Sequence, residues 1–269
     1  DTPVNLILDP SDFIKLSSLT LDGNPVNMLI QKYVTRVNQE IEQALNSLGY
    51  KLQVKDARGN ITQKGYTKEK IQVDNRLGSL NWYEQIPVAE SLGYSRPNNK
   101  QILDFHNHLI RGIKGEIIVK DGADKEVRED ELQDIYDKTF KKGDPWRSEY
   151  LDARFEVTRD KVIMYSGHYT DSSLPLIERI KPENIKASYK KEFKKDELAM
   201  QNGWTKFDNY NEQGLCIKLE QSDEIYNWSP ADKAVARLVA DSGWLLLYCS
   251  RNPADSDPGL GMRLAKILW

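Results

Sequence analysis

The longest regular pattern of apolar residues in the chain lies near its N-terminus, between Asn24 and Gly49. Apolar side chains recur there every three or four positions, at Val26, Ile30, Tyr33, Val37, Ile41, Ala44 and Leu48. This spacing is typical of one buried face of an α-helix. Asn24 suits an N-cap, Pro25 suits the first turn, and Gly49 suits a helix end. The sequence therefore predicts a long amphipathic N-terminal helix, roughly 36 Å in length.

Shorter helix and strand patterns are mixed along the rest of the chain. Further helices are predicted after Asn98 or Asn99, over 129–142, over 182–200, and after Ser229. Hairpins are predicted around 52–61 and around Arg159-Asp160, and strands over 4–8, 115–120, 215–219 and 244–248. We find no fixed-period repeat and no sustained strand–helix–strand rhythm. This mixture predicts an α+β fold of helices and antiparallel hairpins, rather than a doubly wound parallel sheet.

Length and composition indicate a soluble globular protein. The 269 residues, of which 39% are hydrophobic and 29% charged, are enough to bury a core without a disulfide or a metal ion. We expect one compact unit over 1–269. The expected place for an internal boundary is 78–99, which is irregular but rich in aromatic residues.

The charge balance disfavours nucleic acid as a partner, because the net charge is −3 and both signs are spread along the chain. No apolar stretch approaches the length of a membrane span. Cys216 and Cys249 form no CxxC motif and are interpreted as small buried side chains, with their pairing left open. The chain starts at Asp1, which leaves both a removed signal peptide and a shortened chain open.

The chain has three histidines, two of them in the segment Asp104-Phe-His-Asn-His108. This segment resembles the Asp-x-His-x-His element of metal-dependent hydrolases, over five residues only. The resemblance implies a metal site that uses Asp104, His106, His108 and, as the one histidine that remains, His168. However, the apolar spacing around the segment favours a helix, on which His106 and His108 diverge by about 200°. We therefore predict no shared metal site and no cofactor.

His168 lies in Tyr165-Ser-Gly-His-Tyr-Thr170, directly after a predicted strand. A His-x-Thr segment after a strand resembles half of the signature of two-histidine phosphoesterases, but no second copy is present. The Gly-x-Ser-x-Gly nucleophile motif and the P-loop motif are both absent. The alternative interpretation of His168 is a polar residue at a strand end.

Four lysines recur at helical spacing, at Lys186, Lys190, Lys191 and Lys194. They indicate either a basic stripe for phosphate or an acidic partner, or a solvated helix face balanced by neighbouring acids. We favour the solvated face.

Three classes of function follow from these observations. The preferred one is a structural or assembly protein that binds other protein chains, including copies of itself, in a viral particle or an envelope-associated machine. The alternative is a metal-dependent hydrolase or phosphodiesterase that uses Asp104, His106, His108 and His168. A nucleic-acid-binding module, based on the lysines alone, comes third. The balance is against an enzyme.

Overall fold

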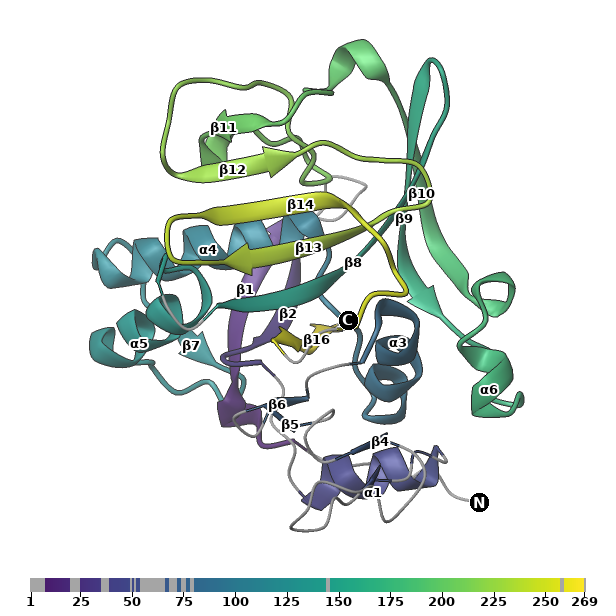
Figure 1. Cartoon of the computed structure of the whole chain (residues 1–269). Helices are drawn as coiled ribbons and strands as arrows, with labels where there is room; N and C mark the ends of the chain where they lie inside the picture. The colour runs from purple at the N-terminus through teal and green to yellow at the C-terminus, as the bar shows by residue number, and fades with distance from the viewer. Residues whose placement is uncertain are drawn as a thin grey trace.

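The computed structural model describes residues 8–19, 25–34, 39–48, 50, 52–53, 66–67, 72–73, 76–77, 80–143, 146–256 and 259–268. Over these residues the protein is mostly β-structure, with two large sheets and five short α-helices (Figure 1). No helix in the described part is long and apolar enough to cross a bilayer.

The smaller of the two large sheets joins the two ends of the described chain. Its strands are arranged in the order β16-β2-β1-β7. Their bounds are Phe13–Leu19 (β1), Pro25–Gln31 (β2), Lys120–Asp121 (β7) and Ala265–Leu268 (β16). Strands β1 and β2 form an antiparallel hairpin, and β16 pairs with β2 through the Ala265–Ile30 register.

The larger sheet has eight strands in the order β10-β9-β8-β13-β14-β12-β11, with β15 paired to β8. Their bounds are Arg147–Val157 (β8), Lys161–Tyr169 (β9), Lys186–Lys194 (β10), Gly203–Thr205 (β11), Ile225–Trp228 (β12), Val235–Ala240 (β13), Leu245–Arg251 (β14) and Leu260–Gly261 (β15). Most pairs are antiparallel, but β12–β14 and β15–β8 are parallel.

The helices of the described residues are Gln39–Ser47 (α1), Trp82–Ser91 (α3), Asn99–Ile113 (α4), Glu129–Thr139 (α5) and Leu176–Arg179 (α6). In Figure 1, α4 and α5 lie on one side of the sheets, and α3 and α6 lie on the other. Two minor sheets pair β3 (Leu52–Gln53) with β4 (Tyr66–Thr67) and β5 (Gln72–Val73) with β6 (Arg76–Leu77). Helix α4 supplies Phe105 to a core that also contains Met28 of β2 and Phe155 of β8, so this helix packs against both large sheets.

The predicted α+β fold with a long N-terminal helix is wrong. Residues 25–31 form strand β2, and a helix begins only at Gln39. Strand β2 is buried on both faces, because Met28 and Ile30 pack in one core cluster and Leu29 in another. A short apolar run of that kind satisfies helical spacing as well as strand spacing.

Two other predicted helices are strands. Residues 186–194 form β10, which pairs with β9, and residues 235–240 form β13, in which all six residues are buried. Ser229 caps no helix, because a turn at 232–233 and then strand β13 follow it. Its hydroxyl and its amide both donate to Asn202 Oδ1. The predicted strand at 215–219 is reduced to a single bridge at Cys216, and of 115–120 only Lys120 lies in a strand.

Several local predictions are confirmed. Asn98 caps α4 through a reciprocal pair of hydrogen bonds with Gln101, and α5 occupies most of 129–142. The hairpin around Arg159-Asp160 is β8–β9, and 244–248 lies largely within β14. The predicted strand at 4–8 and hairpin at 52–61 lie outside the described residues, apart from Leu8 and β3.

Candidate functional site

Helix α4 places His106 and His108 in different surroundings. The buried residues Ile102, Phe105 and Leu109 face the core, as the apolar spacing predicts. His106 stacks on Phe207 with ring centroids 3.6 Å apart and an angle of 4° between the rings. Burial lowers the pKa of His106 to about 4, so its imidazole is neutral and packs as an aromatic ring.

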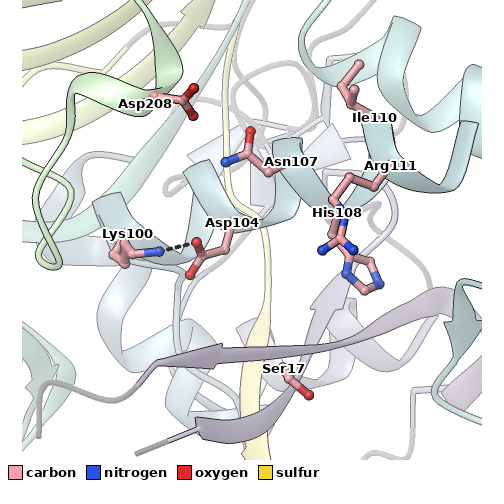
Figure 2. Close-up of a pocket in the computed structure, with 8 residues that line it drawn as sticks. All are labelled: Ser17, Lys100, Asp104, Asn107, His108, Ile110, Arg111 and Asp208. Atoms are coloured by element: carbon pink, nitrogen blue, oxygen red, sulfur yellow. Dashed lines mark hydrogen bonds and ion pairs between the residues drawn. The ribbon is translucent and has the colours of Figure 1, made fainter. Parts of the chain in front are cut away.

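Asp104 and His108 instead line a polar pocket of about 510 Å³ between α4 and β1 (Figure 2). The remaining residues around it are Ser17, Lys100, Asn107, Ile110, Arg111 and Asp208. Lys100 forms an ion pair with Asp104 Oδ1. Burial raises the pKa of Asp104 in spite of this lysine. Burial, helped by the charge of Arg111, lowers the pKa of His108.

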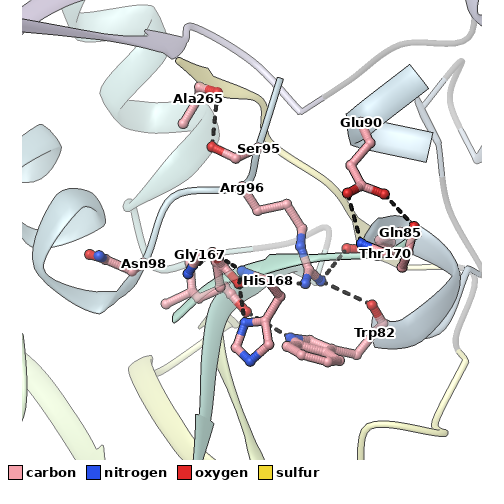
Figure 3. A network of polar contacts seen from close by, with 12 residues as sticks. Trp82, Gln85, Glu90, Ser95, Arg96, Asn98, Gly167, His168, Thr170 and Ala265 are labelled. Carbon is pink, nitrogen blue, oxygen red and sulfur yellow. Dashed lines mark hydrogen bonds and ion pairs between the residues drawn. The ribbon is translucent and has the colours of Figure 1, made fainter. Parts of the chain in front are cut away.

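His168 belongs to a third, enclosed group on the larger sheet (Figure 3). Its Nδ1 lies 2.5 Å from Asp152 Oδ1, and the amide of Gly167 donates to Asp152 Oδ2 at 2.8 Å. Arg96 Nη2 lies 3.9 Å from Asp152 Oδ1. Burial alone would raise the pKa of Asp152, but His168, Arg96 and the amide together hold it below its usual range.

An Asp–His pair of this kind can orient a catalytic imidazole. Here the ring of His168 packs edge-on against Trp82 at 4.7 Å, and the His168 side chain is 1% exposed. A substrate cannot reach the ring in this conformation. The pair therefore acts as a polar link between β8, β9 and α3. Asp152 and Arg96 were not identified from the sequence, because no local motif connects them to His168.

The four residues proposed for a hydrolase therefore lie in three separate environments. Asp104 and His108 share one pocket, whereas His106 and His168 each pack elsewhere. Within the described ranges, no group of three metal-binding side chains comes together.

The four lysines lie on β10, the terminal strand of the larger sheet, and not on a helix. A strand places Lys186, Lys190 and Lys194 on one face and Lys191 on the other. Glu192 forms ion pairs with Lys190 at 3.3 Å and with Lys161 at 3.0 Å. The stripe is therefore split, and one acid of the same strand partly neutralises it.

A group of five aromatic residues lies at the opposite end of this sheet. We refer to Trp204, Tyr226, Trp228, Trp244 and Tyr248 as the aromatic face. The register pairs Trp204 with Tyr226 and Trp228 with Tyr248, so their side chains project from the same side of the sheet. The neighbours Ile225 and Leu247 project to the other side and are fully buried in the core.

The rings of the aromatic face pack against one another. Trp204 stacks on Trp244 at 5.0 Å, and Trp228 stacks on Tyr248 at 4.7 Å. Tyr226 contacts Trp244 edge-on at 5.1 Å. Trp244 remains 43% exposed. In the sequence, the only signal for this face is the period-two spacing of Ile225-Tyr-Asn-Trp228, which is typical of a strand. The rings form one surface only because the partner strands align them.

Cations lie at two edges of the aromatic face. Lys142 Nζ is 5.1 Å from the ring centroid of Trp204, and the Arg237 guanidinium is 5.7 Å from that of Tyr248. Acidic residues Glu220, Asp223, Glu224 and Asp241 lie in the adjoining loops. The edge of the face therefore carries charges of both signs.

Searches of family models, curated proteins and solved structures found no match to this chain.

Proposed function

We propose that the chain is an assembly protein that binds protein through the aromatic face, and that the partner is a second copy of the chain. The supporting observation is the row of five partly exposed rings on one side of a sheet. Tryptophan, tyrosine and arginine are the residues that most often dominate protein interfaces. An exposed apolar patch with a polar edge is typical of such contacts.

The charges around the face support a protein partner over a nucleic acid. Lys142, at one edge of the face, donates to the backbone carbonyl of Asp223 and is therefore already engaged. The carboxylates in the adjoining loops would repel phosphate. A nucleic-acid surface would instead combine its rings with a continuous positive groove.

The mixed charges also support a second copy as the partner. A two-fold axis brings the same patch of each copy together, so an edge with both signs can place cations opposite acids. A flat sheet face can pack on another sheet at about 10 Å, with side chains between them. The small net charge of −3 opposes association only weakly.

The test compares two aromatic residues with the same exposure. Trp244 lies on the aromatic face, and Tyr169 lies at the far end of the sheet; each is 43% exposed. We expect a wild-type dimer by native mass spectrometry and sedimentation. Trp244→Ser should weaken the dimer by about 30-fold or more, as expected for a central interface residue. Tyr169→Ser should leave the dimer intact.

A wild-type monomer at micromolar concentration would reject the proposal, and equal dissociation of both variants would reject the aromatic face as the interface. Steeply salt-dependent binding of an oligonucleotide, lost in Trp244→Ser, would assign the face to nucleic acid instead.

A further inference from the structure

The pocket beside α4 contains two buried polar atoms without a partner among the described residues. They are Asp104 Oδ2 and His108 Nε2. Figure 2 shows both side chains extending from α4 toward the side on which Ser17 of β1 lies. Unpaired buried polar atoms are costly, and two of them in one pocket indicate that a water molecule or a bound ligand supplies their hydrogen bonds.

Both atoms are hydrogen-bond acceptors. Lys100 pairs with the other oxygen of the Asp104 carboxylate, so Oδ2 keeps its lone pairs. His108 also makes a hydrogen bond to the backbone of Lys15 that favours a proton on the ring. Because Nε2 has no partner, that proton lies on Nδ1, and Nε2 carries the lone pair of the neutral imidazole. A ligand here must therefore bring donors.

The surrounding charges select among donor-rich ligands. Lys100 and Arg111 line the same pocket, and Lys100 already neutralises Asp104. A metal ion or an organic ammonium would meet these two cations. An anion would face the carboxylates of Asp104 and Asp208 and would leave both acceptors unpaired. A neutral ligand avoids both costs.

Hydroxyl groups fit the remaining pattern, because each both donates and accepts. Lys100, Asp104, His108 and Arg111 lie along one side of α4 in the order donor, acceptor, acceptor, donor. Asn107 adds an amide with both capacities. The volume of about 510 Å³ lies within the range of about 300–1,000 Å³ that is usual for small-molecule pockets.

We propose that this pocket binds a neutral, hydroxyl-rich ligand of sugar size, with Asp104 and His108 accepting hydrogen bonds from its hydroxyls. Lys100, Asn107 and Arg111 donate to its oxygens. The site is separate from the aromatic face and does not depend on dimer formation.

The test uses the full chain and a panel of methyl glycosides of glucose, galactose and N-acetylglucosamine. Zinc chloride and inorganic phosphate represent the cationic and anionic classes. We expect at least one glycoside to shift the amide resonances of residues 104–111 saturably in ¹⁵N-correlation spectra, with zinc and phosphate inactive. If no glycoside does so, or if zinc or phosphate saturates these residues instead, the proposal fails.

Two variants then assign the contacts. Asp104→Asn and His108→Phe keep the approximate shape but remove an acceptor, and each should weaken glycoside binding about tenfold or more. Asp137→Asn is the matched control, because Asp137 also forms an i,i+4 ion pair with a lysine, on α5 and outside this pocket. Wild-type affinity in both pocket variants, or equal weakening in the control, would overturn the assignment. Circular dichroism of each variant is the check on folding. If one pocket variant does not fold, the other pocket variant alone tests the assignment.

Discussion

The two ends of the eight-stranded sheet share the same backbone structure but carry different side chains. At one end, β10 is nine residues long and carries lysines whose charges are shared with Glu192. At the other end, β11 has only three residues and carries the aromatic face together with its neighbouring strands. A long terminal strand exposes backbone groups that could pair with another chain, and lysines discourage such pairing. We therefore expect the charged end to disfavour association and the aromatic end to favour it.

The two ends also differ in the buried contacts that stabilise them. Between α3 and the strands β8 and β9, the buried group of Asp152, His168 and Arg96 provides polar contacts. Near β11, β12 and β14, apolar packing on one face and ring packing on the other provide the contacts. Loss of a charge should therefore be most costly at the first end, and loss of a ring should mainly affect association at the second.

The largest expected effect is at Asp152. Asp152→Ala leaves Arg96 buried without its carboxylate and should lower the free energy of unfolding by about 3–5 kcal/mol. Urea denaturation measures this change. Glu156→Ala is the control, since Glu156 lies on the same strand but pairs with Arg154 at a part-exposed position, and it should cost less than about 1 kcal/mol. Equal midpoints for the two variants would contradict the contrast between buried and surface charges.

The loss of stability at acid pH should depend on Asp152 as well. The pKa of Asp152 is lower in the folded protein than in the unfolded chain, so its ionised form contributes stability above the unfolded value, near 3.9. That contribution is lost as the pH falls from about 4 through the folded pKa. Denaturation midpoints measured across this range should converge between wild type and Asp152→Ala. A difference that stays constant at low pH would show that Asp152 does not titrate in this way.

A smaller effect is expected within the aromatic face. A double-mutant cycle of Trp204→Ala and Trp244→Ala should yield a coupling energy of about 0.5–1.5 kcal/mol, as for other stacked aromatic pairs. The cycle is measured by denaturation at a concentration below dimer formation, which isolates the contact within one chain. Additive single effects would show that the stack contributes nothing beyond burial.

The smallest effect is expected at the lysine end. Replacing Lys190 and Lys194 by glutamine should change the free energy of unfolding by less than about 0.5 kcal/mol, because both side chains are exposed. Salt-dependent binding of DNA or RNA by the wild type, absent from this variant, would show instead that the lysines form a functional surface.

Local sequence signals predicted part of the fold and part of the candidate site. The N-cap at Asn98 and the apolar spacing after it predicted α4, and with it the divergence of His106 and His108. The turn at Arg159-Asp160 predicted the β8–β9 hairpin. These elements were predictable because their caps, turns and apolar positions lie within a few residues of one another.

The errors at β2 and β13 share one physical cause, and the error at β10 has a related one. In β2 and β13 the strand is buried on both faces, so apolar residues occupy neighbouring positions and can match a helical stripe by chance. In β10 the lysines match helical spacing and also an exposed strand. Only pairing with a neighbouring strand distinguishes the two, and that partner lies elsewhere in the sequence.

By itself, the sequence determined the caps, the turns and the identity of the polar groups, because these depend on residue type and near neighbours. The tertiary structure alone decided which of them meet. It brought Asp152 to His168 across β8 and β9, placed Asp104 and His108 in one pocket without His106, and aligned rings from β11, β12 and β14 on one face. Contacts between distant segments arise when strands pair and bury apolar surface together, and that process depends on the whole chain.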